Sequence, residues 1–385
     1  MIRFEGVTKR YADGVTAVDD LTLEVPQGGI TVFVGPSGCG KTTSLRMINR
    51  MVEPTEGRIL IDDQDIAERK PAQLRRSIGY VIQHAGLFPH RTVLKNVMTV
   101  PKLIGWDTGR ARNAAMEAIE KVGLTADQAE RYPAQLSGGQ QQRVGVARAL
   151  ASDPEVVLMD EPFSAVDPLV RMDLQAEVKR LQRELGITVV LVTHDIDEAI
   201  GLGDHVAVLR QGGRLAQLAS PGELLREPAD DFVASFVGKD RGYRKLGFTD
   251  AVIEPSAEQT VTLGQDVPAG SGWVLAVSEE GAPLGWVDRH TAGGPVGEDE
   301  LHRMGSLAEV GDSARVFLDA ALSAPSGRGV VVEQGRVVGT VEPREVITAL
   351  ERERAERPTG DPVAQPDGEP QGEHVHATDP QEEHA

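Results

Sequence analysis

The sequence predicts an α/β fold with a largely parallel sheet over residues 1 to about 236. Two observations support this prediction. Short β-branched runs alternate with helical patterns, and a glycine-rich turn joins one such run to the helix after it. This alternation is typical of parallel sheets whose crossover connections are helices. The expected strand and helix pairs are Ile30–Val34 with Lys41–Met51, Val156–Met159 with Pro168–Leu185, and Thr188–Val192 with Asp195–Leu202.

The segment from Thr92 to about Ser152 differs from the rest of this region because it lacks a comparable strand run. Helical patterns cover Ala111–Val122 and Gln140–Ala151. A run of helices between two strands of one sheet indicates an insertion. We therefore expect a helical subdomain at about residues 92–152.

A change in composition follows Gly238. Residues 238–247 are polar and contain glycine, as expected of a linker. A weak internal repeat lies within residues 248–350, and each copy predicts a strand, a glycine turn and a second strand. The second copy continues into a helical pattern over Pro343–Leu350, and we expect the two half-units to pack face to face. The copies are Val277–Gly281 with Leu284–Val287, and Val331–Gly335 with Val338–Val341.

Residues 351–385 form an acidic tail with interspersed proline, glycine and glutamine and almost no aliphatic residues. Such a composition cannot bury enough apolar surface to order itself, so disorder is expected. His374, His376 and His384 could form a weak metal site there, but nothing in the sequence fixes their geometry.

Charge and apolar patterning limit the possible partners. Lys and Arg total 40 against 59 Asp and Glu, so the formal net charge of -19 argues against a nucleic-acid backbone as the principal partner. The single cysteine, Cys39, excludes an intramolecular disulfide and fits a reducing compartment. No apolar stretch reaches signal-peptide or membrane-span length, so we expect a chain that is not exported and that meets a membrane only through a partner protein.

A phosphate-binding loop follows the first predicted central strand. Residues 35–42 match the pattern G-x-x-x-x-G-K-[ST] in the required strand-to-helix context. The glycines let backbone N–H groups converge on a β-phosphate at a helix N-terminus, which favours anions. Lys41 would place a charge at the β- and γ-phosphates, and Thr42 would offer a hydroxyl ligand to Mg²⁺. The predicted nucleotide-binding residues here are Gly35, Pro36, Ser37, Gly38, Cys39, Gly40, Lys41, Thr42 and Thr43.

Two carboxylates follow a second apolar strand. Asp160 ends the run Val156–Asp160 and would hold Mg²⁺, the role of the acidic strand end in phosphate-loop proteins. Glu161 lies one residue further on, where it would accept a proton from water that attacks the γ-phosphate.

A second glycine-rich helix start, Leu136–Gln140, lies far downstream of the phosphate loop. It offers another group of backbone N–H donors, which a nucleotide held in its own loop does not obviously need. The natural inference is that two copies of the chain face each other across ATP.

With these motifs in order, residues 1–237 resemble the ATP-binding subunit of an ABC transporter. The resemblance implies an ABC ATPase domain of the P-loop class that binds ATP and Mg²⁺. Tyr11 falls at the position that stacks on adenine in this family. Gln83 matches the Q-loop residue that contacts Mg²⁺ and links the sheet to the helical subdomain. His194 matches the switch histidine that positions the γ-phosphate and the attacking water.

The resemblance also assigns the second glycine-rich turn. Ser137, Gly138 and Gly139, followed by Gln140, match the signature motif that would hold the γ-phosphate of ATP bound to the opposite protomer. Ser164–Asp167 resembles the D-loop, which adds Asp167 to the nucleotide site, with Val166 where leucine is frequent. Because phosphoryl transfer needs mainly positioning and charge stabilisation, Ser137 is not interpreted as a nucleophile.

The family's arrangement explains how ATP would drive motion. Two sites buried between protomers hold the halves together only while both γ-phosphates are present, so hydrolysis favours separation. The implied partners are a second copy of the chain, integral-membrane permease subunits and, indirectly, an extracytoplasmic substrate-binding protein, with no nucleic acid. The implied location is the cytoplasmic face of the plasma membrane, as a peripheral subunit.

Two stretches, Ile78–Thr92 and Val100–Trp106, look like ATPase subunits of importers for quaternary-amine osmoprotectants such as glycine betaine, choline and carnitine. Nothing in these stretches contacts the solute. Leu87, Phe88 and Pro89 would form the groove that receives a permease coupling helix, with plain core packing as the other interpretation.

The repeat in residues 248–350 is similar to a tandem CBS module, a regulatory domain. Gly339–Glu345 resembles the end of one such motif, whereas Gly285–Arg289 in the first copy is degenerate, which puts binding of an adenosyl ligand in doubt. Regulation of transport and a purely structural or dimerising role both stay open. The acidic tail beside it would repel itself less as salt rises, which motivates the hypothesis of an ionic-strength sensor.

Other functions compete with the osmoprotectant importer. They are an importer for another small polar solute such as an amino acid, an exporter, a soluble ABC ATPase acting on a nucleic-acid or ribosomal partner, a P-loop kinase or GTPase, and a non-enzymatic nucleotide-binding regulator. A kinase or GTPase would leave Ser137–Gln140 without a purpose, and the acidic charge disfavours nucleic acid. The absence of fused membrane spans and the osmoprotectant-like sequence favour import over export.

Overall fold

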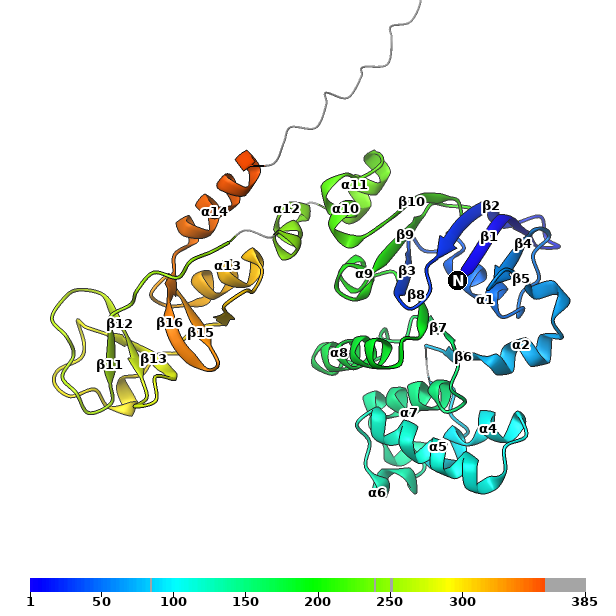
Figure 1. The fold of residues 1–385 in the computed structure, drawn as a ribbon, viewed down its shortest axis with the longest axis horizontal. Helices are drawn as coiled ribbons and strands as arrows, with labels where there is room; N and C mark the ends of the chain where they lie inside the picture. The colour runs from blue at the N-terminus through cyan, green and yellow to red at the C-terminus, as the bar shows by residue number, and fades with distance from the viewer. Residues whose placement is uncertain (84, 239, 250–251, 357–385) are drawn as a thin grey trace, which may run out of the picture. The chain divides into compact units, whose positions relative to one another are not determined.

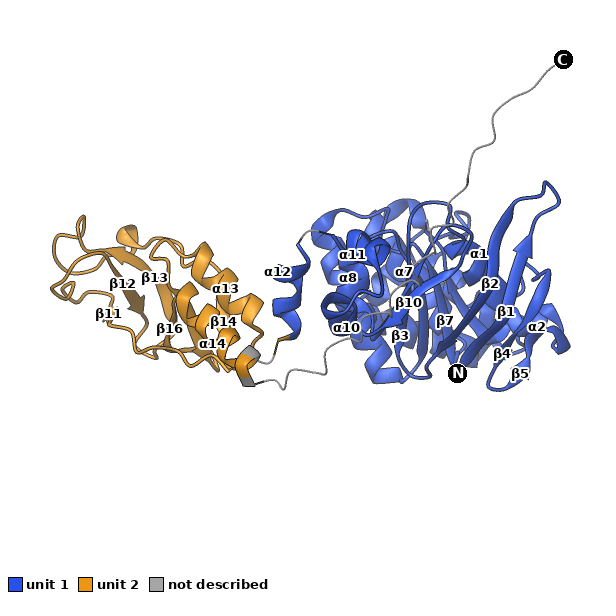
Figure 2. Ribbon diagram, turned by 90° about the horizontal axis from the view of Figure 1, so that it is seen from above, with its two compact units in different colours: residues 1–248 blue, residues 249–385 orange. Residues whose placement is uncertain are grey.

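The computed structural model describes residues 1–83, 85–238, 240–249 and 252–356. The chain divides into two compact units, Met1–Phe248 and a second from Thr249 onward (Figures 1 and 2). Within the described ranges, no helix combines the length and the apolar character that crossing a membrane requires. The predicted tail from residue 357, with its three histidines, lies outside the described residues.

A six-stranded sheet, in the order β10-β9-β3-β8-β7-β6, forms the centre of the first unit. All neighbouring pairs are parallel except β10 with β9. Every residue of β3, β7 and β8 is buried, because other elements of the unit pack on both faces of the sheet. The strands are β3 (Ile30–Val34), β6 (Ile78–Val81), β7 (Val156–Asp160), β8 (Thr188–Val192), β9 (His205–Leu209) and β10 (Leu215–Ala219).

Helices connect these strands as the sequence predicts. The strands Ile30–Val34 and Thr188–Val192 and the helix Pro168–Leu185 are confirmed to the residue, whereas the first helix ends at Ile48, before the predicted Met51. The connecting helices are α1 (Lys41–Ile48), α8 (Pro168–Leu185) and α9 (Ile196–Leu202).

An antiparallel sheet in the order β2-β1-β4-β5 covers one side of α1, and the sequence analysis did not separate it from the central sheet. It shares a core with the central sheet, in which the rings of Phe4 and Phe33 meet edge to face at 6.3 Å. The elements of this layer are β1 (Ile2–Arg10), β2 (Thr16–Val25), β4 (Glu56–Ile61), β5 (Gln64–Asp65) and, after them, η1 (Ile66–Glu68) and α2 (Pro71–Ser77).

Between β6 and β7, the described residues contain helices and turns and no strand. Figure 1 shows α4, α5, α6 and α7 grouped together, apart from β1 and β2. Side chains of Thr92, Asp107, Thr125 and Ser137 cap helix N-termini, which explains why so many short helices form here. The helices are α3 (Val93–Val97), α4 (Thr99–Leu103), α5 (Thr108–Lys121), α6 (Ala126–Ala129), η2 (Pro133–Gln135) and α7 (Gly138–Leu150).

The first unit ends in short helices that include most of the expected linker. Arg244 of α12 pairs with Asp197 of α9 at 2.7 Å, so part of residues 238–247 packs on the first unit. These elements are α10 (Pro221–Arg226), α11 (Asp231–Val237), α12 (Arg241–Lys245) and η3 (Leu246–Phe248).

The second unit contains two three-stranded sheets of the same topology, which confirms the internal repeat. In each sheet the first strand pairs parallel with the second, and the second forms an antiparallel hairpin with the third. Buried residues from both sheets form one apolar cluster around Trp286. The strands are β11 (Thr260–Thr262), β12 (Trp273–Val277), β13 (Pro283–Asp288), β14 (Leu307–Glu309), β15 (Gly329–Glu333) and β16 (Arg336–Val341).

The two copies differ in their helices. Helix α13 (Ala314–Ser323) connects β14 to β15, whereas the described chain between β11 and β12 has no helix. A 3₁₀ turn, η4 (Glu298–Glu300), follows β13, while β16 continues into α14 (Pro343–Glu356). This last helix extends past Leu350 into the stretch that composition assigned to the tail.

Asn96 gives a stability prediction. Its buried side chain accepts from the Phe88 N–H at 2.7 Å and donates to the carbonyls of Phe88, Arg91 and Thr92 at 3.0–3.1 Å. Asn96→Ala leaves these groups unpaired, which costs about 1–3 kcal/mol for each buried group. We expect hydrogen–deuterium exchange of a peptide over residues 86–92 to accelerate at least tenfold. The matched control is Asn113→Ala, an exposed position on α5, and equal exchange in the two variants would contradict the prediction.

Candidate functional site

The turn between β3 and α1 has the backbone of a phosphate-binding loop. Gly38 and Gly40 have φ of 75° and 98°, which side chains other than glycine rarely adopt. A Cβ on Gly40 would lie 2.2 Å from the Ala17 carbonyl oxygen. No side chain caps the N-terminus of α1, so its first N–H groups are available to an anion.

Lys41 begins α1 and its side chain is buried against the loop. The ammonium Nζ donates to the carbonyls of Gly35 at 2.8 Å and Pro36 at 3.0 Å and lies 3.8 Å from Cys39 Sγ. Burial raises the pKa of the Cys39 thiol, although Lys41 opposes the shift, which favours a neutral thiol. The loop therefore carries one buried positive charge, at the place predicted for the β- and γ-phosphates.

Asp160 at the end of β7 accepts hydrogen bonds from three side chains, two on α1 and one on β6. Thr42 Oγ1 donates to its Oδ1 at 3.0 Å, while Arg46 and Tyr80 donate to its Oδ2 at 3.2 and 3.3 Å. Burial is the main cause that raises the pKa of the Tyr80 phenol. Thr42 and Asp160, both predicted Mg²⁺ ligands, are thus brought together.

Glu161 and His194 also meet. Glu161 has a φ of 46°, a strained conformation for a residue other than glycine, and its N–H donates to Val192 at 3.0 Å. His194 Nδ1 lies 3.4 Å from Glu161 Oε2. The predicted general base and the predicted switch histidine therefore lie side by side at the carboxyl ends of β7 and β8.

The segment after β6 contains Gln83, which is exposed, and His84, which lies outside the described residues. Side chains of α7 hold the carbonyls that flank Gln83. Gln142 donates to Ile82 at 3.4 Å, and Arg148 donates to Ala85 at 2.6 Å and to Gly86 at 2.7 Å. This segment is therefore fixed to the helical part of the unit.

The second glycine-rich turn is a helix start, as predicted. Ser137 caps α7, and its backbone N–H donates in return to the Gln140 side chain at 3.0 Å. Gly139 packs so closely on α8 that a Cβ would lie 2.3 Å from Val170 Cγ1. Among the described residues, Ser137, Gly138 and Gly139 make no hydrogen bond with residues 35–43 of the same chain.

Tyr11 and Asp167 stand apart from this cluster. Tyr11 is 40% exposed, and the Lys9 ammonium lies 5.3 Å from its ring centroid. Asp167 caps α8 by accepting from the Val170 N–H at 3.2 Å. Both lie in unit 1, yet neither forms a hydrogen bond or ion pair with Lys41 or Asp160 among the described contacts.

The residues present fit a Mg²⁺-nucleotide. The hydroxyl of Thr42 and the carboxylate of Asp160 are oxygen ligands of the kind that Mg²⁺ prefers. The glycine turn leaves open space beside Gly38, where an added Cβ would meet only Gln211 Nε2 at 4.0 Å. The phosphates of a nucleotide would thus meet the N–H groups at the start of α1, the ammonium of Lys41 and the open space beside Gly38.

Several contributors were missed by the sequence analysis. Arg46 lies four residues after Thr42 on α1, so helical spacing could have placed both on one face. Tyr80 gave no such signal, because its contact with Asp160 depends on the pairing of β6 with β7. Thr193 and Glu198, which hold the turn around His194, were missed as well.

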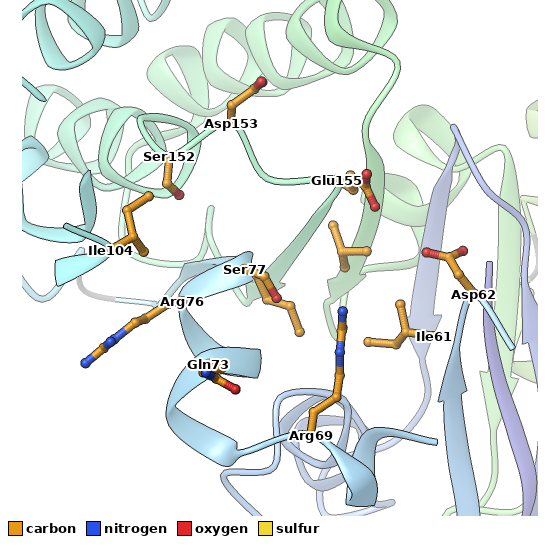
Figure 3. Close-up of a pocket in the computed structure, with 12 residues that line it drawn as sticks. Ile61, Asp62, Arg69, Gln73, Arg76, Ser77, Ile104, Ser152, Asp153 and Glu155 are labelled. Carbon is orange, nitrogen blue, oxygen red and sulfur yellow. The ribbon is translucent and has the colours of Figure 1, made fainter. Parts of the chain in front are cut away.

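A cavity of about 600 Å³ lies elsewhere in the first unit (Figure 3). Its lining includes Ile61 and Asp62 at the end of β4, Arg69 and Arg76 around α2, and Glu155 before β7. None of the predicted nucleotide-site residues lines it. The predicted nucleotide site is therefore separate from this cavity.

Comparisons with known proteins identify the family and several relatives of this chain. A family model described as "ABC transporter" matches residues 18–164. The osmoprotectant import ATP-binding protein OsmV of Salmonella typhimurium is 42% identical over 375 residues, 93% of this chain and 98% of OsmV. The glycine betaine/carnitine/choline transport ATP-binding protein OpuCA of Bacillus subtilis is 50% identical over 266 residues, 69% of this chain and 70% of OpuCA.

A solved structure is also similar to this chain in its fold. The dimeric post-hydrolysis state of the ATP-binding cassette MJ0796, bound to ADP and Pi, is 35% identical with a TM-score of 0.53. The match covers 57% of this chain and 99% of that cassette. Motifs, geometry and a relative matched along nearly its whole length agree, and the chain belongs to the family of ABC transporter ATP-binding proteins.

Proposed function

We propose that this chain is the ATP-hydrolysing subunit of an importer for quaternary-amine osmoprotectants such as glycine betaine, choline or carnitine. The observation that carries the proposal is the match to an osmoprotectant import ATP-binding protein over 93% of the chain, the second unit included. Shared identity in the cassette alone would support only a transporter ATPase, because both import and export use the same ATP site.

We propose a role for each residue of the nucleotide site. Bound Mg²⁺ would supply charge neutralisation at the phosphates, with Thr42, Asp160 and, through the Q-loop, Gln83 around it. Lys41 would turn its buried ammonium from loop carbonyls toward the β- and γ-phosphates.

The two residues beside the metal ligands would act on water. Glu161 would take the proton from the attacking water as its oxygen approaches the γ-phosphate. His194, 3.4 Å from that carboxylate, would orient the water and the γ-phosphate. Tyr11 would stack on the adenine ring.

Two copies of the chain would close each site. Because Ser137 and Gly138 form no hydrogen bond with their own phosphate loop in the part of the chain that the structure describes, we infer that they serve the ATP of the partner copy. Their helix start offers N–H groups that suit a γ-phosphate. Asp167, at the exposed start of α8, would join the same interface. Loss of the γ-phosphate then removes the contact that favours the closed dimer.

The loop 87–92 is suited to receive a membrane partner. Phe88 is 38% exposed, the Arg91 guanidinium stacks on its ring at 4.7 Å, and Asn96 fixes the backbone beneath. Arg148 ties the preceding residues to the helix that carries Ser137. A permease helix seated against Phe88 would thus be connected, through Arg148 and α7, to the Ser137 turn that would contact the γ-phosphate.

For the second unit we propose a regulatory module related to the tandem CBS type. The repeated sheet topology supports this proposal, and the absence of a helix between β11 and β12 marks the first copy as the degenerate one. A ligand site built from helices of both copies would lack one wall. We therefore favour regulation in which the second unit contacts another protein surface over regulation by a nucleotide bound symmetrically between the two copies.

Solute uptake tests the proposed function. Cells that lack the gene for this chain should lose uptake of radiolabelled glycine betaine, choline or carnitine at raised salt, and a plasmid copy should restore it. Uptake of a labelled amino acid provides the control. Loss of amino-acid uptake with unchanged uptake of all three quaternary amines would overturn the solute assignment and leave the ATPase assignment intact.

Glu161→Gln tests the hydrolytic role. The substitution keeps the shape but removes the proton acceptor, so kcat should fall by roughly 10²- to 10⁴-fold while ATP binding is retained. Light scattering should detect dimers that persist with Mg²⁺-ATP. Glu155→Gln, an exposed carboxylate just before the same strand, is the matched control. Undiminished turnover by Glu161→Gln would exclude it as the base.

Subunit mixing tests whether the sites are shared. Lys41→Ala and Ser137→Arg should each be inactive alone, but their mixture contains dimers in which one intact phosphate loop faces one intact Ser137 turn. Phosphate release by the mixture should therefore exceed that of either variant. A mixture of Lys41→Ala with the Lys41→Ala/Ser137→Arg double variant has no intact pair and serves as the control. No gain in the first mixture would mean that each chain completes its own site.

A further inference from the structure

Glu198, on α9, is a buried carboxylate that the mechanism above does not use. Its side chain is 7% exposed. Thr193 Oγ1 donates to its Oε2 at 2.6 Å, and Gln175 Nε2 of α8 donates to its Oε1 at 3.3 Å. Burial is the main cause that raises the pKa of Glu198, so its place in the interior has a cost.

The bond to Thr193 reaches the turn that carries His194. The buried Thr193 hydroxyl donates to Glu198 and accepts from the Asp195 N–H at 3.0 Å. This one oxygen therefore connects the residue before His194 to the residue after it. Because a hydroxyl has one proton, the carboxylate of Glu198 directs that proton away from Asp195 and leaves a lone pair for the N–H. The orientation of this turn thus depends on Glu198.

The other side of Glu198 faces α8, which begins where the segment Ser164–Asp167 ends. Arg171 Nε lies 3.9 Å from Glu198 Oε1, and Arg171 Nη1 lies 3.9 Å from Asp195 Oδ2. The same guanidinium donates to the Val166 carbonyl at 3.5 Å. One cation therefore lies between the D-loop backbone, Glu198 and the turn around His194.

We propose that Glu198, through Thr193 and Arg171, is a positioning residue that fixes the His194 turn relative to the D-loop. The inference rests on the proposed ATP hydrolysis, since it concerns the same site. In this arrangement a shift of the first turn of α8, where Asp167 would meet a second copy, changes the support of His194 within its own chain. Residue Glu198 contacts no reacting group itself; it acts by holding the residues that do.

Plain packing is the competing explanation. A buried carboxylate with two hydrogen-bond donors can stabilise α9 and α8 without any effect on chemistry. The two explanations differ in what they predict. Packing alone predicts a change in melting temperature with turnover per folded molecule unchanged, whereas positioning predicts a loss of kcat in a chain that is folded and still binds ATP.

The experiment compares Thr193→Val, Thr193→Ser and Glu198→Ala in the full chain. Thr193→Val is nearly isosteric and removes only the hydroxyl, so it should fold, bind ATP with Kd within about twofold of the unsubstituted chain, and lose about 10- to 100-fold in kcat. Thr193→Ser restores the hydroxyl and should recover most of kcat. Glu198→Ala removes the same hydrogen bond and also the Arg171 contact, so its kcat should be at least as low as that of Thr193→Val. Glu184→Ala, an exposed ion-pair partner of Arg180 on α8, is the control and should leave kcat unchanged.

A double variant separates a shared path from two independent effects. Thr193→Val/Glu198→Ala should be no slower than the slower single variant, because both changes remove the same hydrogen bond. Undiminished kcat in Thr193→Val, or additive losses in the double variant, would overturn the inference. If Glu198→Ala does not fold, the Thr193→Val and Thr193→Ser pair alone decides. Absence of ATP hydrolysis in the unsubstituted chain would instead count against the proposed function, so the two failures are distinguishable.

Discussion

The parallel register of β3, β8 and β7 is the constraint on which the site depends. Phe33 on β3 and Asp160 on β7 both pair with Val192 on β8, so the three strands end at nearly the same level. The residues that follow each strand therefore meet without long side chains reaching across the fold. This arrangement follows the general rule that parallel sheets place ligands at the carboxyl ends of their strands. A one-residue slip of β7 would turn Asp160 to the opposite face.

Much of this could be read from the sequence, because each motif combines a local pattern with its secondary-structure context. The run Ile30–Val34, followed by glycines and Lys41, predicts a strand, a turn and a helix from local rules alone. Contacts between segments distant in sequence could not be read in the same way. Tyr80 reaches Asp160 only through strand pairing, and Gln175 reaches Glu198 only through helix packing. The roles assigned by resemblance, including those of Tyr11 and Gln83, stay predictions.

The second unit shows how far a repeat can diverge while its topology is kept. Both copies retain one parallel and one antiparallel pairing, yet only the second has a helix between its first two strands. The first copy instead contributes Trp273 and Trp286 to the contact between copies, where the Arg328 guanidinium lies 5.0 Å from the Trp286 ring centroid. Arg328 also pairs with the nearly buried Glu258 at 2.8 Å. Large side chains of the first copy thus lie at the contact between the two halves.

The hydrogen bonds to Asp160 bear on how this carboxylate would accept a metal ion. Its two oxygens accept hydrogen bonds from Thr42, Arg46 and Tyr80, so the carboxylate has hydrogen-bond partners within its own chain. Binding of a metal–nucleotide complex would exchange this set of partners for another instead of neutralising an unpaired charge. The chain therefore supplies its own hydrogen-bond partners to a carboxylate that would otherwise be buried and unpaired at the end of β7.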